Sequence, residues 1–212
     1  MKGFSPSEGF IVKGPGLSSH FGYSVGNAGD FNGDGYDDVI IGAPYGNSDG
    51  GTIYIILGGP RSQLSDMSLS SGIDPSRAIA IKRTIQAGNL GYAVNGAGDV
   101  NEDGIDDIII GAPLVDDRIG MAFVVFGSRN SGPEIIFNND LGPQEGFSII
   151  GGNSDDVLGM SVSQAGDVNG DGLNDLVVGA AGANGNSGAA YVLFPKSKRK
   201  FLSEINLFFS VS

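Results

Sequence analysis

The sequence repeats itself three times, and this repetition constrains the fold more than any other feature. The nonapeptides DFNGDGYDD, DVNEDGIDD and DVNGDGLND begin at residues 30, 99 and 167, so the repeat recurs after 69 and 68 residues. FGYSVGNAGD, LGYAVNGAGD and LGMSVSQAGD precede them, and VIIGAP, IIIGAP and VVGAAG follow. Self-similarity at a fixed period indicates one supersecondary unit stacked on copies of itself. The 212 residues are therefore expected to form one regular array and not two independent folds.

Each repeat contains four short runs with the composition of β-strands. They are rich in β-branched and aromatic residues and are bounded by Gly, Asn, Asp and Ser, which is typical of strands and not of helices. The pattern predicts an all-β fold, a β-propeller-type array of three four-stranded antiparallel blades. The strand after each FG or LG is the expected inner strand. Each acidic nonapeptide then becomes the hairpin loop between the first and second strands of its blade, and the three loops share one face.

The repeat boundaries divide the chain into five segments. We expect the outer strand of an adjoining blade in 1–14, repeats in 15–83, 84–151 and 152–195 with the third incomplete, and a divergent tail in 196–212. The apolar run at 205–212 is either the missing outer strand of the third blade or a ragged end. Propellers close with about four to eight blades, so three blades form an open arc unless further repeats or a second copy complete the ring.

The charge balance narrows the range of partners. There are 24 acidic and 12 basic residues, a formal net charge of −12, and half of the acids lie in the three nonapeptides. This balance argues against nucleic acid and anionic membranes and favours cations. No apolar run approaches the roughly 20 residues that span a bilayer, so no direct membrane insertion is expected. Cys is absent, and the first residues lack the apolar core of a secretory signal, so any signal peptide is expected outside this sequence.

Each acidic loop presents the oxygen ligands that calcium prefers. Side-chain oxygens at positions 1, 3 and 5 point inward in a tight loop, and Gly at position 6 allows the turn. The backbone carbonyl of position 7 and a bidentate Asp at position 9 then bring the number of oxygen ligands to six. That number suits Ca²⁺ better than Mg²⁺, so three Ca²⁺ sites are predicted. The predicted ligands are Asp30, Asn32, Asp34, Tyr36 and Asp38; Asp99, Asn101, Asp103, Ile105 and Asp107; and Asp167, Asn169, Asp171, Leu173 and Asp175.

The loops also resemble two other kinds of structure. An EF-hand begins with the same D-x-N-x-D-G but needs Glu at position 12, where this chain has Ile41, Ile110 and Val178. Asp, Asn and Gly are also ordinary turn residues. Three loops with every ligand position filled favour the metal site over a plain turn.

The combined motif resembles a known family. FG at 21, GAP at 42–44 and the nonapeptide between them are similar to the FG-GAP repeats of the integrin alpha-subunit β-propeller and its bacterial relatives, over about residues 9–194. The resemblance implies four-stranded blades, Ca²⁺ between the first two strands, and a role in extracellular adhesion or ligand binding. The integrin ring has seven repeats, so three blades would be part of a larger ring. This chain departs from the motif with LG at 90 and 158 and with Gly179, Ala180 and Ala181 in place of GAP.

The function expected is a calcium-binding module of an extracellular or cell-surface protein that binds a protein or glycan ligand through the face opposite the calcium loops. Tyr45 and Arg118 are the candidate ligand-binding residues, because Tyr and Arg are enriched at binding hot spots. The alternatives are an accessory propeller of a secreted hydrolase or lyase whose catalytic domain lies elsewhere, and a structural array without a ligand. Homo-association, or completion of the ring by further repeats, is also expected.

No catalytic constellation is expected in this chain. GYSVG at 22–26 matches the G-x-S-x-G motif, but a Gly-rich loop follows it where the motif requires a helix. The single histidine, His20, lies in a predicted loop. No acid, base and nucleophile converge, so the chain is not expected to be an enzyme.

Overall fold

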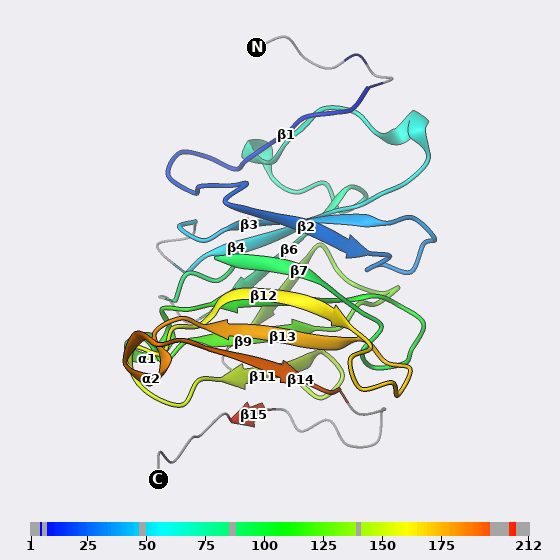
Figure 1. Cartoon of the computed structure of the whole chain (residues 1–212). Coiled ribbons are helices and arrows are strands. Elements are labelled where there is room, and N and C mark those ends of the chain that lie inside the picture. The colour runs from blue at the N-terminus through cyan, green and yellow to red at the C-terminus, as the bar shows by residue number, and fades with distance from the viewer. Residues whose placement is uncertain are drawn as a thin grey trace.

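Nearly all regular structure in the chain is β-strand, arranged in successive sheets (Figure 1). The computed structural model describes residues 5, 8–46, 50–84, 88–138 and 141–195 and the backbone of 204–206. None of the helices in these ranges is long and apolar enough to cross a membrane.

Three sheets are built from antiparallel hairpins in the order that the repeat predicts. In each repeat the inner strand pairs with the second strand and the second with the third, and in the first two repeats a fourth strand follows. The strands are β2 (Ser24–Gly29), β3 (Asp38–Ala43), β4 (Thr52–Ile56) and β6 (Ala78–Arg83); β7 (Ala93–Gly98), β8 (Asp107–Ala112), β9 (Met121–Val125) and β11 (Gly146–Ile150); and β12 (Leu158–Gly166), β13 (Asp175–Ala180) and β14 (Ala189–Leu193). The all-β, propeller-type prediction is confirmed.

The long connections add strands that the sequence did not predict. β5 (Met67–Ser68), β10 (Glu134–Phe137) and β15 (Glu204–Asn206) each follow a third strand and pair in parallel with an earlier outer strand. Their partners are β1 (Val12–Lys13), β6 and β11. The surplus length of the repeat therefore extends the edge of the preceding sheet.

The tail follows this same order. Of the apolar run 205–212 the structure describes only 205–206, which belong to β15 at the edge of the second sheet. Its interpretation as the outer strand of the third blade is wrong for these residues. Like β5 and β10, β15 follows the third strand of its repeat and pairs in parallel with an earlier outer strand. It does so although the sequence of the tail no longer resembles the repeat. The basic run at 196–200 lies outside the described residues.

Short turns complete the connections. They are the 3₁₀ turns Arg61–Gln63 and Leu69–Ser71 and the one-turn segments α1 (Val115–Arg118) and α2 (Ala183–Asn186). Figure 1 shows α1 and α2 at one end of the strands and the β2–β3, β7–β8 and β12–β13 hairpin loops at the other.

The sheets stack face to face, and the core lies between them. One apolar cluster joins the first and second sheets, with Ile40 and Ile53 packed with Ile108 and Phe123. A second cluster joins the second and third sheets. β4 and β9 are buried along their whole length because apolar clusters cover both faces of each strand, which explains their continuous apolar sequences.

The glycines of the repeat motif allow adjacent sheets to approach closely. The N–H of Gly22 donates to the carbonyl of Gly42 at 3.1 Å, and the N–H of Gly91 donates to that of Gly111 at 3.0 Å. A Cβ at Gly42 would collide with the carbonyl of Gly91 in the next repeat. The FG or LG pair and the GAP triplet are thus contact points, both within a sheet and between sheets.

Candidate metal centre and the opposite face

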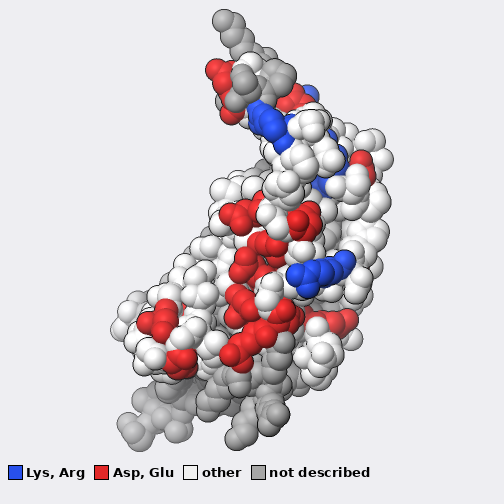
Figure 2. Space-filling view, turned by 90° about the vertical axis from the view of Figure 1, so that its right-hand side faces the viewer, with Lys and Arg blue, Asp and Glu red and all other residues white. Residues whose placement is uncertain are grey.

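The three acidic loops lie where the sequence places them, between the first and second strands of each sheet. Figure 2 views the molecule from the side of these loops and shows a band of acidic side chains running across successive sheets, with a basic side chain beside it. The band concentrates negative charge along one edge of the stack.

The same hydrogen bonds shape each loop. The first-position aspartate accepts the backbone N–H groups of positions 5 and 6: those of Asp34 and Gly35 donate to Asp30 at 2.8 and 2.9 Å. The corresponding distances are 2.9 and 2.7 Å to Asp99, and 3.0 and 2.9 Å to Asp167. This repetition shows that the first-position aspartates of the three loops are structurally equivalent.

The ninth-position aspartates are buried, and backbone N–H groups hold them. Asp38 Oδ2 accepts the N–H of Phe31 at 3.1 Å and Oδ1 that of Gly58 at 2.8 Å. Asp107 accepts the N–H of Val100 and of Gly127, both at 2.9 Å. Burial raises the pKa of Asp38 to about 6 and that of Asp107 to about 8, although these hydrogen bonds oppose the shift. A cation would offset the cost of the buried charge.

Two buried oxygens of predicted ligand residues have no hydrogen-bond partner among the described residues. They are Oδ1 of Asn101, at position 3 of the second loop, and Oδ1 of Asp175, at position 9 of the third. Both residues are over nine-tenths buried. An unsatisfied buried oxygen is costly, and a cation is one group that would satisfy it. The donor set and these two atoms fit a hard divalent cation.

As they stand, the carboxylates do not converge on one point. Among the described residues, no group of three acidic or histidine side chains is arranged to hold a metal ion. The hydrogen bonds explain this, because the carboxylates at positions 1 and 5 point toward backbone N–H groups of their own loop. In the first loop Asp34 accepts the N–H of Tyr36 at 3.0 Å and the amide of Asn32 at 2.9 Å. A cation would have to draw these oxygens together, so the fifteen ligand assignments stay a prediction.

The structure also brings the loops into contact with one another, which the sequence did not reveal. Asp106 of the second loop hydrogen bonds to Asp30 of the first, and Arg129 Nε donates to the carbonyl of Gly33 at 3.2 Å. An acid or amide recurs at position 8 as Asp37, Asp106 and Asn174, which is the one sequence signal of this contact.

The opposite face carries a cluster of aromatic side chains around Tyr45. Tyr45 packs edge-on against His20, with ring centroids 4.8 Å apart, and against Tyr23 at 6.0 Å. Tyr23 also contacts Tyr92 of the next repeat at 5.0 Å, and hydrogen bonding with Tyr92 raises the pKa of Tyr23 to about 12. Tyr23 and Tyr45 remain partly exposed. The sequence analysis predicted Tyr45 as a binding residue but not the tyrosines after FG and LG, of which Tyr23 contacts Tyr45 and Tyr92 contacts Tyr23.

Arg118 belongs to a separate part of this face. Its Nε forms an ion pair with Asp155 Oδ1 at 2.9 Å, which links the second repeat to the third, and both side chains are largely exposed. No contact joins Arg118 to the Tyr45 cluster among the described residues. Arg118 follows Asp116 and Asp117, and all three have positive φ angles, 64°, 47° and 49° in that order.

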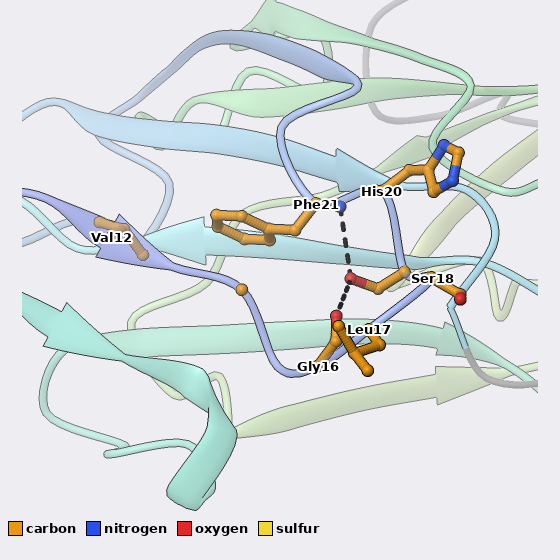
Figure 3. Close-up of a pocket in the computed structure, with 8 residues that line it drawn as sticks. Val12, Gly16, Leu17, Ser18, His20 and Phe21 are labelled. Carbon is orange, nitrogen blue, oxygen red and sulfur yellow. Dashed lines mark hydrogen bonds between the residues drawn. The ribbon is translucent and has the colours of Figure 1, made fainter. Parts of the chain in front are cut away.

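Figure 3 shows an open hollow formed by the segment that leads into β2. It has a volume of about 630 Å³ and is lined mainly by Val12, Leu17, Phe21 and two glycines. Within its lining, Ser19 Oγ donates to the Gly16 carbonyl at 3.1 Å and accepts the Phe21 N–H at 3.4 Å. His20 points away from Phe21. The hollow is therefore an open surface depression whose lining mixes apolar side chains with Ser18, Ser19 and His20.

Ser24, from the G-x-S-x-G match, has a structural contact. It lies within β2, and its Oγ donates to the carbonyl of Gly91 at 2.7 Å. That bond ties the inner strand of the first sheet to the entry of the second.

Antiparallel sheets stacked along their inner strands, with an acidic hairpin loop after each inner strand, define a β-propeller-type repeat protein. The FG-GAP repeat matches residues 21–56, 90–130 and 158–193, together more than half of the chain. The chain belongs to the FG-GAP repeat family, as its motifs indicated.

The chain is similar to integrin alpha subunits over most of its length. It is 30% identical to integrin alpha-5 of Xenopus laevis over 183 residues, which are 82% of this chain and 16% of that protein. It is 29% identical to integrin alpha-PS3 of Drosophila melanogaster over 187 residues, 86% of this chain and 15% of that protein. For integrin alpha pat-2 of Caenorhabditis briggsae the identity is 31% over 184 residues, 81% of this chain and 14% of that protein. The chain thus spans about a sixth of the length of these relatives.

Proposed function

We propose that the chain is a calcium-binding FG-GAP module of an extracellular or cell-surface protein and that it serves in adhesion by binding a protein or glycan. The similarity to integrin alpha subunits supports the adhesive role. The observation that carries the calcium function is the equivalence of the three loops, each with a first-position aspartate that organises the turn and a buried aspartate at position 9.

Calcium would act in this chain chiefly by neutralising charge that the fold has concentrated. Each loop holds three ligand carboxylates, and the ninth-position carboxylate is almost fully buried. Like charges a few ångströms apart repel, and burial strengthens that repulsion. A carboxylate oxygen has two lone pairs, so Asp38 can keep the N–H of Gly58 and still coordinate a cation. Calcium would therefore stabilise the blades and fix the loops.

The ligand would bind at the opposite end of the strands. The aromatic cluster around Tyr45 joins the first two repeats there and is partly exposed at the ends of the stacked strands. Loops on a rigid scaffold can vary without disturbing the fold beneath, which suits them to recognition. The partner is expected to be a macromolecule, because the depression at Val12–Phe21 near this end is open and does not enclose a small molecule.

Calorimetric titration of the full chain with calcium tests the metal function. We expect uptake of three ions per chain, with Asp38→Ala reducing the number to two because it disables only the first loop. Magnesium in place of calcium should bind more weakly, since it requires a rigid octahedron. A chain that takes up no calcium at millimolar concentration would overturn this part of the proposal.

A further inference from the structure

Adjacent acidic loops are joined through a side chain that is not a predicted ligand. Asp106 is the eighth residue of the second loop, between the predicted ligands Ile105 and Asp107. Its Oδ2 accepts the backbone N–H of Asp30 at 2.9 Å, and its own N–H donates to the Asp30 carbonyl at 3.4 Å. Asp106 therefore pairs with both backbone polar groups of the residue that begins the first loop.

The fold leaves space for this contact in two successive repeats. Gly29, just before Asp30, has a φ angle of +64°, and a Cβ there would collide with the Asp106 carboxylate. Gly98, just before Asp99, has a φ angle of +70°, and a Cβ there would collide with the amide of Asn174. The eighth residue of a loop thus lies against the start of the preceding loop in both cases.

The rest of the first loop is also held by the second repeat. The N–H of Ser128 donates to the carbonyl of Phe31 at 3.0 Å, and Arg129 Nε donates to that of Gly33 at 3.2 Å. The side chain of Phe31 is fully buried in the core between the first two sheets. The shape of the first loop therefore depends on groups outside its own repeat.

We propose that Asp106 is a positioning residue that couples cation binding in the first two loops, so that a filled second loop raises the affinity of the first. This inference rests on the proposed calcium function. A cation bound through the Ile105 carbonyl and Asp107 fixes Asp106 between them. The fixed carboxylate then holds Asp30 in place, so less conformational entropy remains to be lost when the first loop binds its own cation. Asn174 lies against Gly98 without a side-chain hydrogen bond to the second loop among the described residues, so we expect the second and third loops to be coupled more weakly.

Three glycine amides report the three loops separately. At position 6, Gly35 donates to Asp30 at 2.9 Å, Gly104 to Asp99 at 2.7 Å and Gly172 to Asp167 at 2.9 Å. Their NMR signals, followed in the full chain during a calcium titration, give a midpoint for each loop. Asp103→Ala disables the second loop, and we expect it to move the Gly35 midpoint to about fivefold higher calcium. In the Asp106→Ala background the same change should move that midpoint less than about twofold. Repulsion between bound cations is present in both backgrounds and cancels in the comparison.

Two variants separate the contact from the charge. Asp106→Asn retains a side-chain oxygen that can accept the Asp30 N–H, so most of the coupling should remain. Asp37→Ala removes the same charge from position 8 of the first loop, and Asp37 has no side-chain hydrogen bond among the described residues, so the coupling should be unchanged. In chelator, the Asp30 amide should exchange its hydrogen about tenfold faster in Asp106→Ala than in Asp37→Ala.

The possible results distinguish this inference from the proposed function. Two results would show that Asp106 does not couple the loops, although calcium binding would stand. In the first, the loops respond to calcium but Asp103→Ala leaves the Gly35 midpoint unchanged. In the second, Asp103→Ala shifts the Gly35 midpoint by the same factor in the Asp106→Ala background. Unchanged exchange at Asp30 would show that the hydrogen bond itself is absent. If none of the three glycine signals responds to calcium, the calcium function fails and the coupling fails with it.

Discussion

The backbone N–H of Gly127 donates to Oδ1 of the buried Asp107 at 2.9 Å, across the end of the second sheet. Gly58 makes the same bond to Asp38 in the first repeat. Pro195 occupies the equivalent position in the third repeat, and proline has no N–H. This substitution explains why Oδ1 of Asp175 has no partner among the described residues. The third loop is therefore the one whose buried carboxylate is least well satisfied by the protein.

Replacing this proline should stabilise the chain in chelator. Pro195→Ala supplies the missing N–H, and a hydrogen bond to a charged acceptor contributes about 1.5 to 3 kcal/mol. Greater freedom of the unfolded chain costs about 0.4 to 1 kcal/mol. We expect a net gain of about 1 kcal/mol in the free energy of unfolding, measured by urea denaturation. Pro133→Ala is the control, because it carries the entropic cost without a new bond. Equal losses in the two variants would refute the explanation.

Calcium should determine how stable the chain is. At free calcium about ten times the dissociation constant, each loop contributes about 1.4 kcal/mol, so three contribute about 4 kcal/mol. For a chain of this size, that corresponds to a rise of about 10 °C in the melting temperature. Calorimetric melting with calcium and with chelator measures the difference. Asp38→Ala should remove about a third of the calcium effect, and a melting temperature that ignores calcium would contradict the prediction.

The buried aspartates predict how stability varies with pH when calcium is chelated. Burial raises the folded-state pKa of Asp38 to about 6 and that of Asp107 to about 8, above the ordinary aspartate value of about 4. At a pH between the unfolded-state and folded-state pKa of each aspartate, the folded chain binds more protons than the unfolded chain. The stability that the two protonated aspartates contribute is therefore full below about pH 4, and it is lost as the pH rises through 6 for Asp38 and through 8 for Asp107. We expect the melting temperature in chelator to fall from pH 5 to pH 8.5.

Two comparisons check the origin of this slope. Saturating calcium favours the ionised carboxylates, so it should remove the fall. Asp107→Asn replaces the titrating group with a neutral one of the same shape, so it should remove the upper part of the fall in chelator. A slope that persists unchanged in Asp107→Asn would assign it to other groups.

The sequence predicted the parts of the fold that depend on local pattern. The inner strands, the hairpin loops and the two outer strands β6 and β11 follow from runs bounded by turn residues. β10 and β15 could not be predicted, because their sequences are short and their pairing is with an outer strand of an earlier repeat. The contact of Asp106 with Asp30 and that of Tyr23 with Tyr92 are equally non-local, since they depend on how adjacent sheets stack.

The turn at Asp116–Arg118 stores strain at its middle residue, where its counterpart in the third repeat has a glycine. Asp117 has a φ angle of 49°, and Gly185 adopts 66° at the equivalent position. A left-handed conformation costs a non-glycine residue about 1 to 2 kcal/mol. Replacing Asp117 with glycine removes this cost, but the greater entropy of glycine in the unfolded chain offsets part of the gain. Asp117→Gly should therefore raise the free energy of unfolding by about 0.5 to 1 kcal/mol. Asp37→Gly, at a residue without positive φ, should lower it. A loss of stability in both variants would argue against strain at Asp117.

The placement of the ligand face can be tested by cell attachment to surfaces coated with the chain in calcium. Tyr45→Ala removes the ring that joins His20 to Tyr23, so it should reduce attachment about tenfold or more, as expected for a binding hot spot. Arg118→Glu reverses a charge on the same face and breaks the exposed ion pair with Asp155, which itself contributes little to stability. Both variants should keep the wild-type melting temperature and calcium uptake. Asp37→Ala and Glu102→Ala, on the side of the metal loops, serve as matched controls and should attach normally. Loss of attachment in these controls alone, at unchanged calcium uptake, would move the ligand site to the calcium face.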